Sequence, residues 1–261
     1  MMIAVRSSVL ITVVWSGILM TTAQGDQVEK QFLSRVFTTD QGALPYRLLI
    51  PQNYDHDKDY PLVIFYHGAG ERGSDNRKQL VHGMADFISD DVRNKYACFV
   101  IAPQSPEDSQ WVETPWSADA HDMPKKPSDP LRLSLELVDS LKQEFSIDQS
   151  RIYITGLSMG GYAVWDVLQR HPRRFAAAVP ICVVGDQALA ERIAHVPLWP
   201  FHGASDQVVN PKRTRAMIDA LQAAGGKPGY TEYPGVGHNS WEATYANRQL
   251  YAWLFSQRLP E

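Results

Sequence analysis

The sequence predicts an α/β fold in which helices cover both faces of a mostly parallel sheet. Strand-like and helix-like segments alternate from residue 61 to residue 258, which is the pattern of parallel strands with helical crossovers. Residues 61–66 form a nearly continuous apolar run that suits a strand buried on both faces. The 261 residues are 44% apolar and 21% charged, a globular composition, and the chain is long enough to bury a sizeable core.

The first 25 residues differ from the rest of the chain. Arg6 is the only charge in residues 1–24, an apolar run follows over residues 9–20, and small and polar residues occupy 21–25. This layout predicts a secretory signal peptide over residues 1–25, cut after Ala23 or Gly25, and a secreted or periplasmic catalytic domain over residues 26–261. An uncleaved membrane anchor is the alternative, although the apolar run is short for a membrane span.

The elements can be assigned in order from periodicity, caps and turns. Residues 31–38 and 44–51 alternate and flank a turn at 40–42, which predicts an N-terminal antiparallel hairpin. Ser128-Asp129-Pro130 is expected to start a helix, and Asn210 is expected to be the N-cap of another, with Pro211 at its first position. The expected strands after the hairpin are 61–66, 97–103, 151–155, 176–184, 198–201 and 230–233, and the expected helices are 77–94, from 128, 162–170, 187–194, 210–225 and 245–258.

Charge and cysteine content exclude several classes of function. The net charge is −4 and there is no run of Lys or Arg, so a nucleic-acid partner is not expected. The chain has no CxxC or HExxH motif and no His-rich cluster, so a metal site is not expected. Cys98 and Cys182, the only two cysteines, lie in apolar runs typical of buried thiols, but a disulfide between them stays open.

The central motif is Gly156-Leu-Ser158-Met-Gly160, between a strand-like run and a helix-like run. G-x-S-x-G in this position predicts a nucleophile elbow, a sharp turn that exposes the serine hydroxyl above the sheet. Glycine two residues before and after Ser158 leaves the tight turn free of side chains. The alternative is an ordinary strand-to-helix turn with glycine present only for packing.

A serine nucleophile needs a base and a group that orients the base. Asp206 follows one predicted strand and His238 follows the last one, so the chain order is Ser158, Asp206, His238, as in enzymes with a nucleophile elbow. Asp206 could instead cap a turn, and His238 could be an ordinary loop histidine. His202 and Asp186 are competing candidates for base and acid, although their positions favour structural contacts.

Two backbone N–H groups are expected to stabilise the negative oxygen of the reaction intermediate. One is that of Met159, directly after the nucleophile, and the other lies in the small-residue loop that begins at His67. Ala69 is the favoured donor in this loop, with Gly70 as the alternative. Glu71 and Arg72 are expected to pair and hold the loop.

Four segments together resemble the α/β-hydrolase superfamily: residues 67–73 (HGAGERG), 156–162 (GLSMGGY), 177–182 (AAVPIC) and 235–241 (GVGHNSW). They are similar to secreted bacterial esterases labelled predicted peptidase or phospholipase/carboxylesterase, and to polyhydroxybutyrate depolymerase-like and feruloyl-type esterases. The resemblance spans roughly residues 35–259. It implies a triad of Ser158, Asp206 and His238, no cofactor, and an open site, since no large cap domain separates the elbow helix from Asp206.

The sequence therefore predicts a serine hydrolase that cleaves carboxylic esters of small molecules or carbohydrates through an acyl-enzyme, without stable membrane insertion after signal removal. A serine peptidase of the prolyl-oligopeptidase type shares the triad order and is one alternative. A binding module that has lost turnover is another. The irregular stretch 104–127 follows a strand end, where α/β sites are built, and carries two tryptophans. Trp111, Trp116 and Trp241 are candidate walls for the substrate, or else packing residues.

Overall fold

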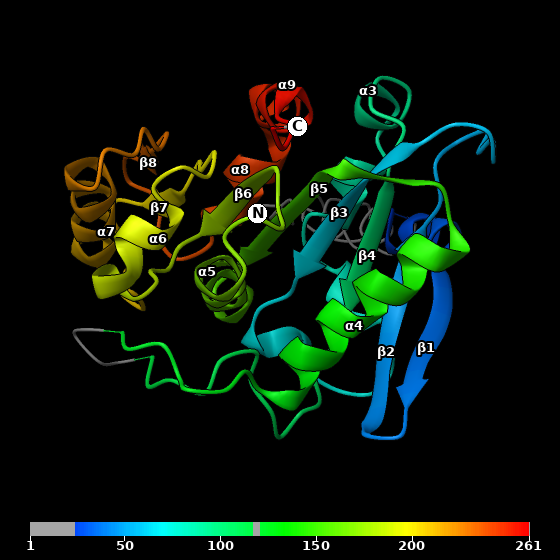
Figure 1. Cartoon of the computed structure of the whole chain (residues 1–261), viewed down its shortest axis with the longest axis horizontal. Helices are drawn as coiled ribbons and strands as arrows, with labels where there is room; N and C mark the ends of the chain where they lie inside the picture. The colour runs from blue at the N-terminus through cyan, green and yellow to red at the C-terminus, as the bar shows by residue number, and fades with distance from the viewer. Residues whose placement is uncertain (1–23, 117–120, 261) are drawn as a thin grey trace, which may run out of the picture.

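A computed structural model describes residues 24–116 and 121–260 (Figure 1). Its centre is one eight-stranded sheet with the order β1-β2-β4-β3-β5-β6-β7-β8. The strands are β1 (Leu33–Thr39), β2 (Gly42–Leu49), β3 (Tyr60–Tyr66), β4 (Phe99–Pro103), β5 (Ile147–Leu157), β6 (Ala177–Ile181), β7 (Phe201–Gly203) and β8 (Thr231–Tyr233). The predicted signal segment lies almost wholly outside the described residues.

Strand directions confirm the predicted mostly parallel sheet with an N-terminal hairpin. β1 and β2 pair antiparallel, and β2 also pairs antiparallel with β4. From β4 through β3, β5, β6, β7 and β8 every pairing is parallel. The carboxyl ends of these six strands therefore meet at one edge of the sheet, where α/β proteins build their sites.

Helices cover both faces of the sheet, as predicted. Apolar side chains of α4 (Asp129–Glu144), α5 (Met159–Arg170), α6 (Ala190–Ile193) and α7 (Pro211–Ala223) join the core on one face. Those of α2 (Met84–Phe87), α3 (Asp90–Arg93), α8 (Trp241–Ala246) and α9 (Arg248–Ser256) join the core on the other. Figure 1 shows α4 and α5 on the opposite side of the sheet from α3 and α9.

Two segments predicted as single helices are divided into shorter elements in the structure. The segment 77–94 forms the 3₁₀ turn η2 (Lys78–Leu80) followed by α2 and α3, because Gly83 has a left-handed φ of 74° and Ser89 is extended with ψ of 144°. The last helix begins earlier than expected, at Trp241, and is divided at Asn247, where ψ of 108° is not helical. Both interruptions come from backbone conformations that apolar spacing does not report.

Caps, connections and cysteines complete the description of the fold. The side chains of Ser128 and Asn210 cap α4 and α7. Between α5 and β7 the described chain adds only β6, the 3₁₀ turn η3 (Gln187–Leu189) and α6, so no cap domain is inserted there. Cys98 and Cys182 are buried and not joined to each other. Within the described residues, no helix has the length and apolar character needed to cross a membrane.

Candidate active site

The turn between β5 and α5 holds Ser158 in a strained conformation. Ser158 has φ of 50° and ψ of −121°, a region that residues with a side chain rarely occupy. The flanking glycines are packed against backbone. A Cβ on Gly160 would lie 2.0 Å from the carbonyl oxygen of Tyr66, and one on Gly156 would lie 2.5 Å from that of Gly160. The glycine spacing of the motif thus follows from close contact between the elbow and β3.

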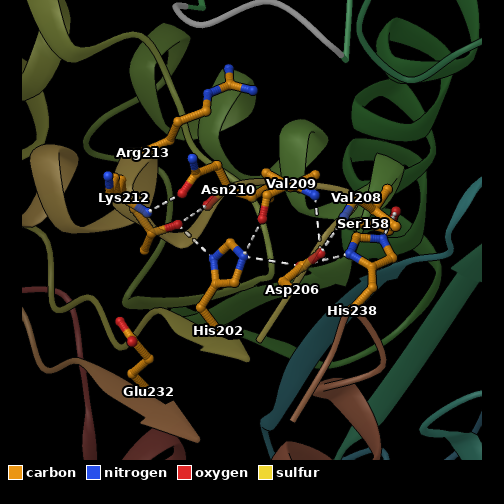
Figure 2. A network of polar contacts seen from close by, with 12 residues as sticks. Ser158, His202, Asp206, Val208, Val209, Asn210, Lys212, Arg213, Glu232 and His238 are labelled. Carbon is orange, nitrogen blue, oxygen red and sulfur yellow. Dashed lines mark hydrogen bonds and ion pairs between the residues drawn. The ribbon is translucent and has the colours of Figure 1, made fainter. Parts of the chain in front are cut away.

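Ser158, His238 and Asp206 form a continuous hydrogen-bonded chain (Figure 2). Ser158 Oγ lies 2.9 Å from His238 Nε2, and His238 Nδ1 lies 2.8 Å from Asp206 Oδ2. A carboxylate can only accept, so Nδ1 carries the proton and Nε2 is left to accept the serine proton. Ser158 and Asp206 are 48 residues apart in the sequence, and Asp206 and His238 are 32 apart. All three side chains meet at the carboxyl ends of β5, β7 and β8.

The carboxylate of Asp206 is saturated with donors. The side chain is fully buried, Oδ1 accepts from the backbone N–H groups of Val208 and Val209, and Oδ2 accepts from His238 and His202. Burial alone would raise the pKa of Asp206, but the hydrogen bonds from His202, His238 and Val209 hold it well below its usual range. The group is therefore ionised wherever the protein is folded near neutral pH.

The loop after β3 lies against the nucleophile. A Cβ on Gly68 would be 3.6 Å from Cβ of Ser158, and Ala69 begins the 3₁₀ turn η1 (Ala69–Glu71) directly after it. Met159 is the first residue of α5. The first N–H groups of a helical turn have no acceptor within that turn, so those of Met159 and Ala69 are free of intrahelical bonds. Their role as oxyanion donors stays a proposal.

The loop is held differently from the expected Glu71–Arg72 pair. Arg72 Nε donates to the carbonyl oxygen of Ala69 at 2.9 Å, and the carboxylate of Glu71 faces His82 Nε2 at 3.6 Å. His67 is buried, and its Nε2 accepts from the backbone N–H of Ser105 at 3.0 Å. Burial lowers the pKa of His67 to about 4, so this ring is a neutral structural group.

The three tryptophans have different environments. Trp111 is fully buried, and its indole N–H donates to the carbonyl oxygen of His67 at 3.1 Å. It therefore supports the loop after β3, which is the packing role that the sequence left open for it, and does not line a substrate surface. Trp241 is partly exposed, with its ring centroid 5.5 Å from that of His238. Trp116 is also partly exposed and lines a cavity of about 580 Å³ beside the Asp206 loop.

The competing residues take other places. Asp186 caps η3 through Ala188 and accepts from the backbone N–H of Met123, so it fixes the end of the segment 104–127. His202 is fully buried and lies behind Asp206, away from Ser158. Its contact with the triad carboxylate is a feature that sequence reasoning missed, although a histidine four residues before Asp206 was its signal.

Three side chains at the site carry atoms of the kind that bind metal ions. Single ligand atoms of Cys182, Asp206 and His238 lie within 4.8 Å of one another. Burial raises the pKa of the Cys182 thiol far above its usual range, so this sulfur stays protonated, whereas metals bind the thiolate. Asp206 and His238 are bound to each other, as the chain from Ser158 to Asp206 requires. The donor set suits a proton relay better than a cation.

The eight-stranded sheet, the strained serine turn and the convergent histidine and aspartate define an α/β-hydrolase. A family profile described as Phospholipase/Carboxylesterase matches residues 53–249. The chain belongs to that family.

Several individual proteins are similar to this chain in sequence or in fold. The crystal structure of a thermostable esterase is 38% identical with a TM-score of 0.82, covering 89% of this chain and 64% of that one. A bifunctional acetylxylan esterase/xylanase of Neocallimastix patriciarum is 25% identical over 122 residues. The aligned region covers 45% of this chain and 17% of the length of that enzyme. The feruloyl esterase module of Clostridium thermocellum, complexed with sinapinate, shares the fold at 14% identity, with a TM-score of 0.65 and coverage of 87% and 88%. The chain thus spans less than two thirds of the first two proteins.

Proposed function

We propose that this protein hydrolyses carboxylic esters through a covalent acyl-enzyme. The observation that carries the proposal is the chain of contacts from Ser158 Oγ through His238 to Asp206, with distances of 2.9 Å and 2.8 Å. A hydroxyl whose proton is already directed at a free imidazole nitrogen is prepared to attack a carbonyl carbon. The family to which the chain belongs supports the same chemistry.

In the first half of the reaction, Ser158 Oγ attacks the ester carbonyl while His238 Nε2 takes the serine proton. The bond between carbonyl carbon and alcohol oxygen then breaks, and His238 returns the proton to the leaving alcohol. Asp206 keeps the imidazole in the required tautomer and stabilises its positive charge. The N–H groups of Met159 and Ala69 donate to the transient oxyanion. In the second half, water activated by His238 releases the acid.

The substrate that we propose is an ester of modest size, with carbohydrate-linked acyl groups as the first class to examine. Trp116 and Trp241 offer partly exposed aromatic surface near the triad. Such surface suits aromatic acyl groups and sugar rings. The acetylxylan and feruloyl esterase relatives support this choice.

The test combines chemical labelling with two families of substrate. A fluorophosphonate probe should label Ser158, as located by mass spectrometry of the digested protein. Short-chain p-nitrophenyl esters, acetylated xylan and feruloylated arabinoxylan should be hydrolysed, and peptide p-nitroanilides should not. Preferential cleavage of the anilides would favour the prolyl-oligopeptidase-type alternative. Labelling without turnover of either class would favour a binding module.

We also propose that residues 1–25 direct export. The proposal stands on the charge, apolar run and small residues of this segment. N-terminal sequencing of protein collected outside the cytoplasm should begin after residue 23 or residue 25. An intact N-terminus on membrane-bound protein would instead indicate an anchor.

A further inference from the structure

His202 is a second histidine on the triad carboxylate. Its Nε2 lies 3.1 Å from Asp206 Oδ2, the same oxygen that accepts from His238 Nδ1 at 2.8 Å. Figure 2 shows the two imidazoles on opposite sides of Asp206. Both His202 and the Asp206 side chain are fully buried. The mechanism proposed above gives His202 no task, although its ring contacts the group that orients the base.

The partners of His202 determine where its protons lie. Nε2 faces two acceptors, Asp206 Oδ2 and the carbonyl oxygen of Val209 at 3.0 Å, so it must carry a proton. Nδ1 lies 2.7 Å from the hydroxyl oxygen of Thr214. That hydroxyl donates its single proton to the carbonyl oxygen of Val183 at 3.0 Å, and can therefore only accept from His202.

We infer that His202 is an imidazolium, protonated on both ring nitrogens, and acts as a positioning residue that ties down Asp206 and offsets part of its negative charge. This inference rests on the proposed ester hydrolysis only in its kinetic consequences. If Nδ1 were unprotonated, Thr214 could satisfy it only by leaving two oxygens, its own and that of Val183, facing each other at 3.0 Å without a proton. The Val183 carbonyl oxygen would then keep only the longer hydrogen bond from the Trp165 indole N–H at 3.4 Å, and the direct contact between two buried acceptors is costly.

The charges around the pair are consistent with a buried cation. Asp206 supplies the counter-charge at 3.1 Å. Glu232, opposite His202 on β8, is ion-paired with Arg215 of α7. Burial raises the pKa of both Cys182, after β6, and Tyr162, on α5, so these two groups stay neutral.

Arg213 of α7 and His238 complete the set of titratable groups around the pair. Arg213 lies farther out, against the hydroxyl of Tyr162. His238 is the remaining neighbour, and its Nδ1 shares Asp206 Oδ2 with His202. Protonating it places a second cation on the same carboxylate oxygen, so a charged His202 opposes that step.

The direct test is a spectrum of the wild-type protein. ¹⁵N-histidine labelling should give one ring, near pH 7.5, with both nitrogens protonated and both protons protected from solvent. The signals should vanish in His202→Gln. A His202 ring with only Nε2 protonated would overturn the inference. This measurement does not depend on turnover, so a failure of the proposed ester hydrolysis remains distinguishable from it.

Kinetics give a second, independent readout. His202→Gln keeps an N–H aimed at Asp206 but removes the charge. In the pH profile of kcat/KM, the fall in activity on the acid side (the acid limb) should then move to higher pH by about one unit. The reason is that a neighbouring positive charge no longer opposes protonation of His238. Thr214→Val, which leaves Nδ1 without an acceptor, should shift the limb in the same direction. A purely structural His202 would lower stability and leave the limb in place, which contradicts the inference.

His195 provides a matched control. It is exposed and its Nε2 contacts the carbonyl oxygen of Pro172, away from the triad. His195→Gln should leave both the acid limb and the His202 signals unchanged. If it shifted the limb as far as His202→Gln does, the effect would not depend on contact with Asp206 and the inference would fail.

Discussion

Gly160 packs directly against the backbone of Tyr66, so closely that a Cβ there would lie 2.0 Å from the Tyr66 carbonyl oxygen. The atom that such a Cβ would meet belongs to the backbone and not to a flexible side chain. The steric overlap could therefore be relieved only if β3 and the elbow moved apart. We expect Gly160→Ala to destabilise the protein by about 3 kcal/mol or more and to reduce ester hydrolysis through displacement of Ser158. Thermal and urea unfolding of the purified variant would measure this.

Gly70→Ala is the control for that experiment. A Cβ on Gly70 would meet no atom within 4 Å, and its φ is not in the left-handed region. Its unfolding midpoint should match that of the wild type within error. Equal stability of Gly160→Ala and Gly70→Ala would show that the contact between the elbow and β3 is not as tight as described.

Removal of the Ser158 hydroxyl separates chemistry from folding. Ser158→Ala should lower kcat for a p-nitrophenyl ester by about a thousandfold or more, because no atom remains to form the acyl-enzyme. The fold should persist, since the hydroxyl contacts only His238 among the hydrogen bonds described. Ser256→Ala, on the exposed last turn of α9, should retain full activity. Near-normal activity in Ser158→Ala would exclude Ser158 as the nucleophile.

Acid should destabilise the protein through Asp206. The pKa of Asp206 is held well below the usual range in the folded state. In acid, between the folded and the unfolded pKa, the unfolded chain therefore binds a proton that the folded protein does not. The stabilisation is complete at neutral pH and is lost as the pH falls toward the folded pKa. Asp206→Asn lacks this titration. The stability gap between wild type and Asp206→Asn should therefore narrow between about pH 5 and pH 3. A gap that stays constant in urea titrations over this range would contradict the assignment.

The parts of this structure that could be predicted from sequence are those governed by local pattern. Apolar runs indicated the buried strands, and a polar residue followed closely by proline, at Ser128 and at Asn210, placed two helix starts within a residue. The G-x-S-x-G motif placed the elbow because its steric requirement is local to a few residues. The convergence of the serine, aspartate and histidine side chains could be predicted because parallel strands end at the same edge of a sheet.

The parts that could not be predicted depend on contacts distant in sequence or on single backbone angles. Nothing local shows that Trp111 is buried under the loop after β3, since its indole partner His67 is 44 residues away. The left-handed Gly83 breaks an otherwise helical spacing. The role inferred for His202 requires Thr214 and Val183, from a helix and a strand end, to meet around one ring.

The side chain of Trp116 should govern how well aromatic or sugar-linked esters bind. The ring lines the cavity beside the Asp206 loop, with the guanidinium of Arg72 6.0 Å from its centroid. Trp116→Leu should raise KM for a feruloyl ester several-fold with little change in kcat, because the side chain touches the substrate body and not the reacting carbonyl. KM for p-nitrophenyl acetate, which has only an acetyl group on the acid side, should change less. Trp253→Leu, on α9 across the sheet, serves as the control for loss of an indole. An equal rise in KM for both esters, or a fall in kcat alone, would place Trp116 in the support of the triad and not in substrate binding.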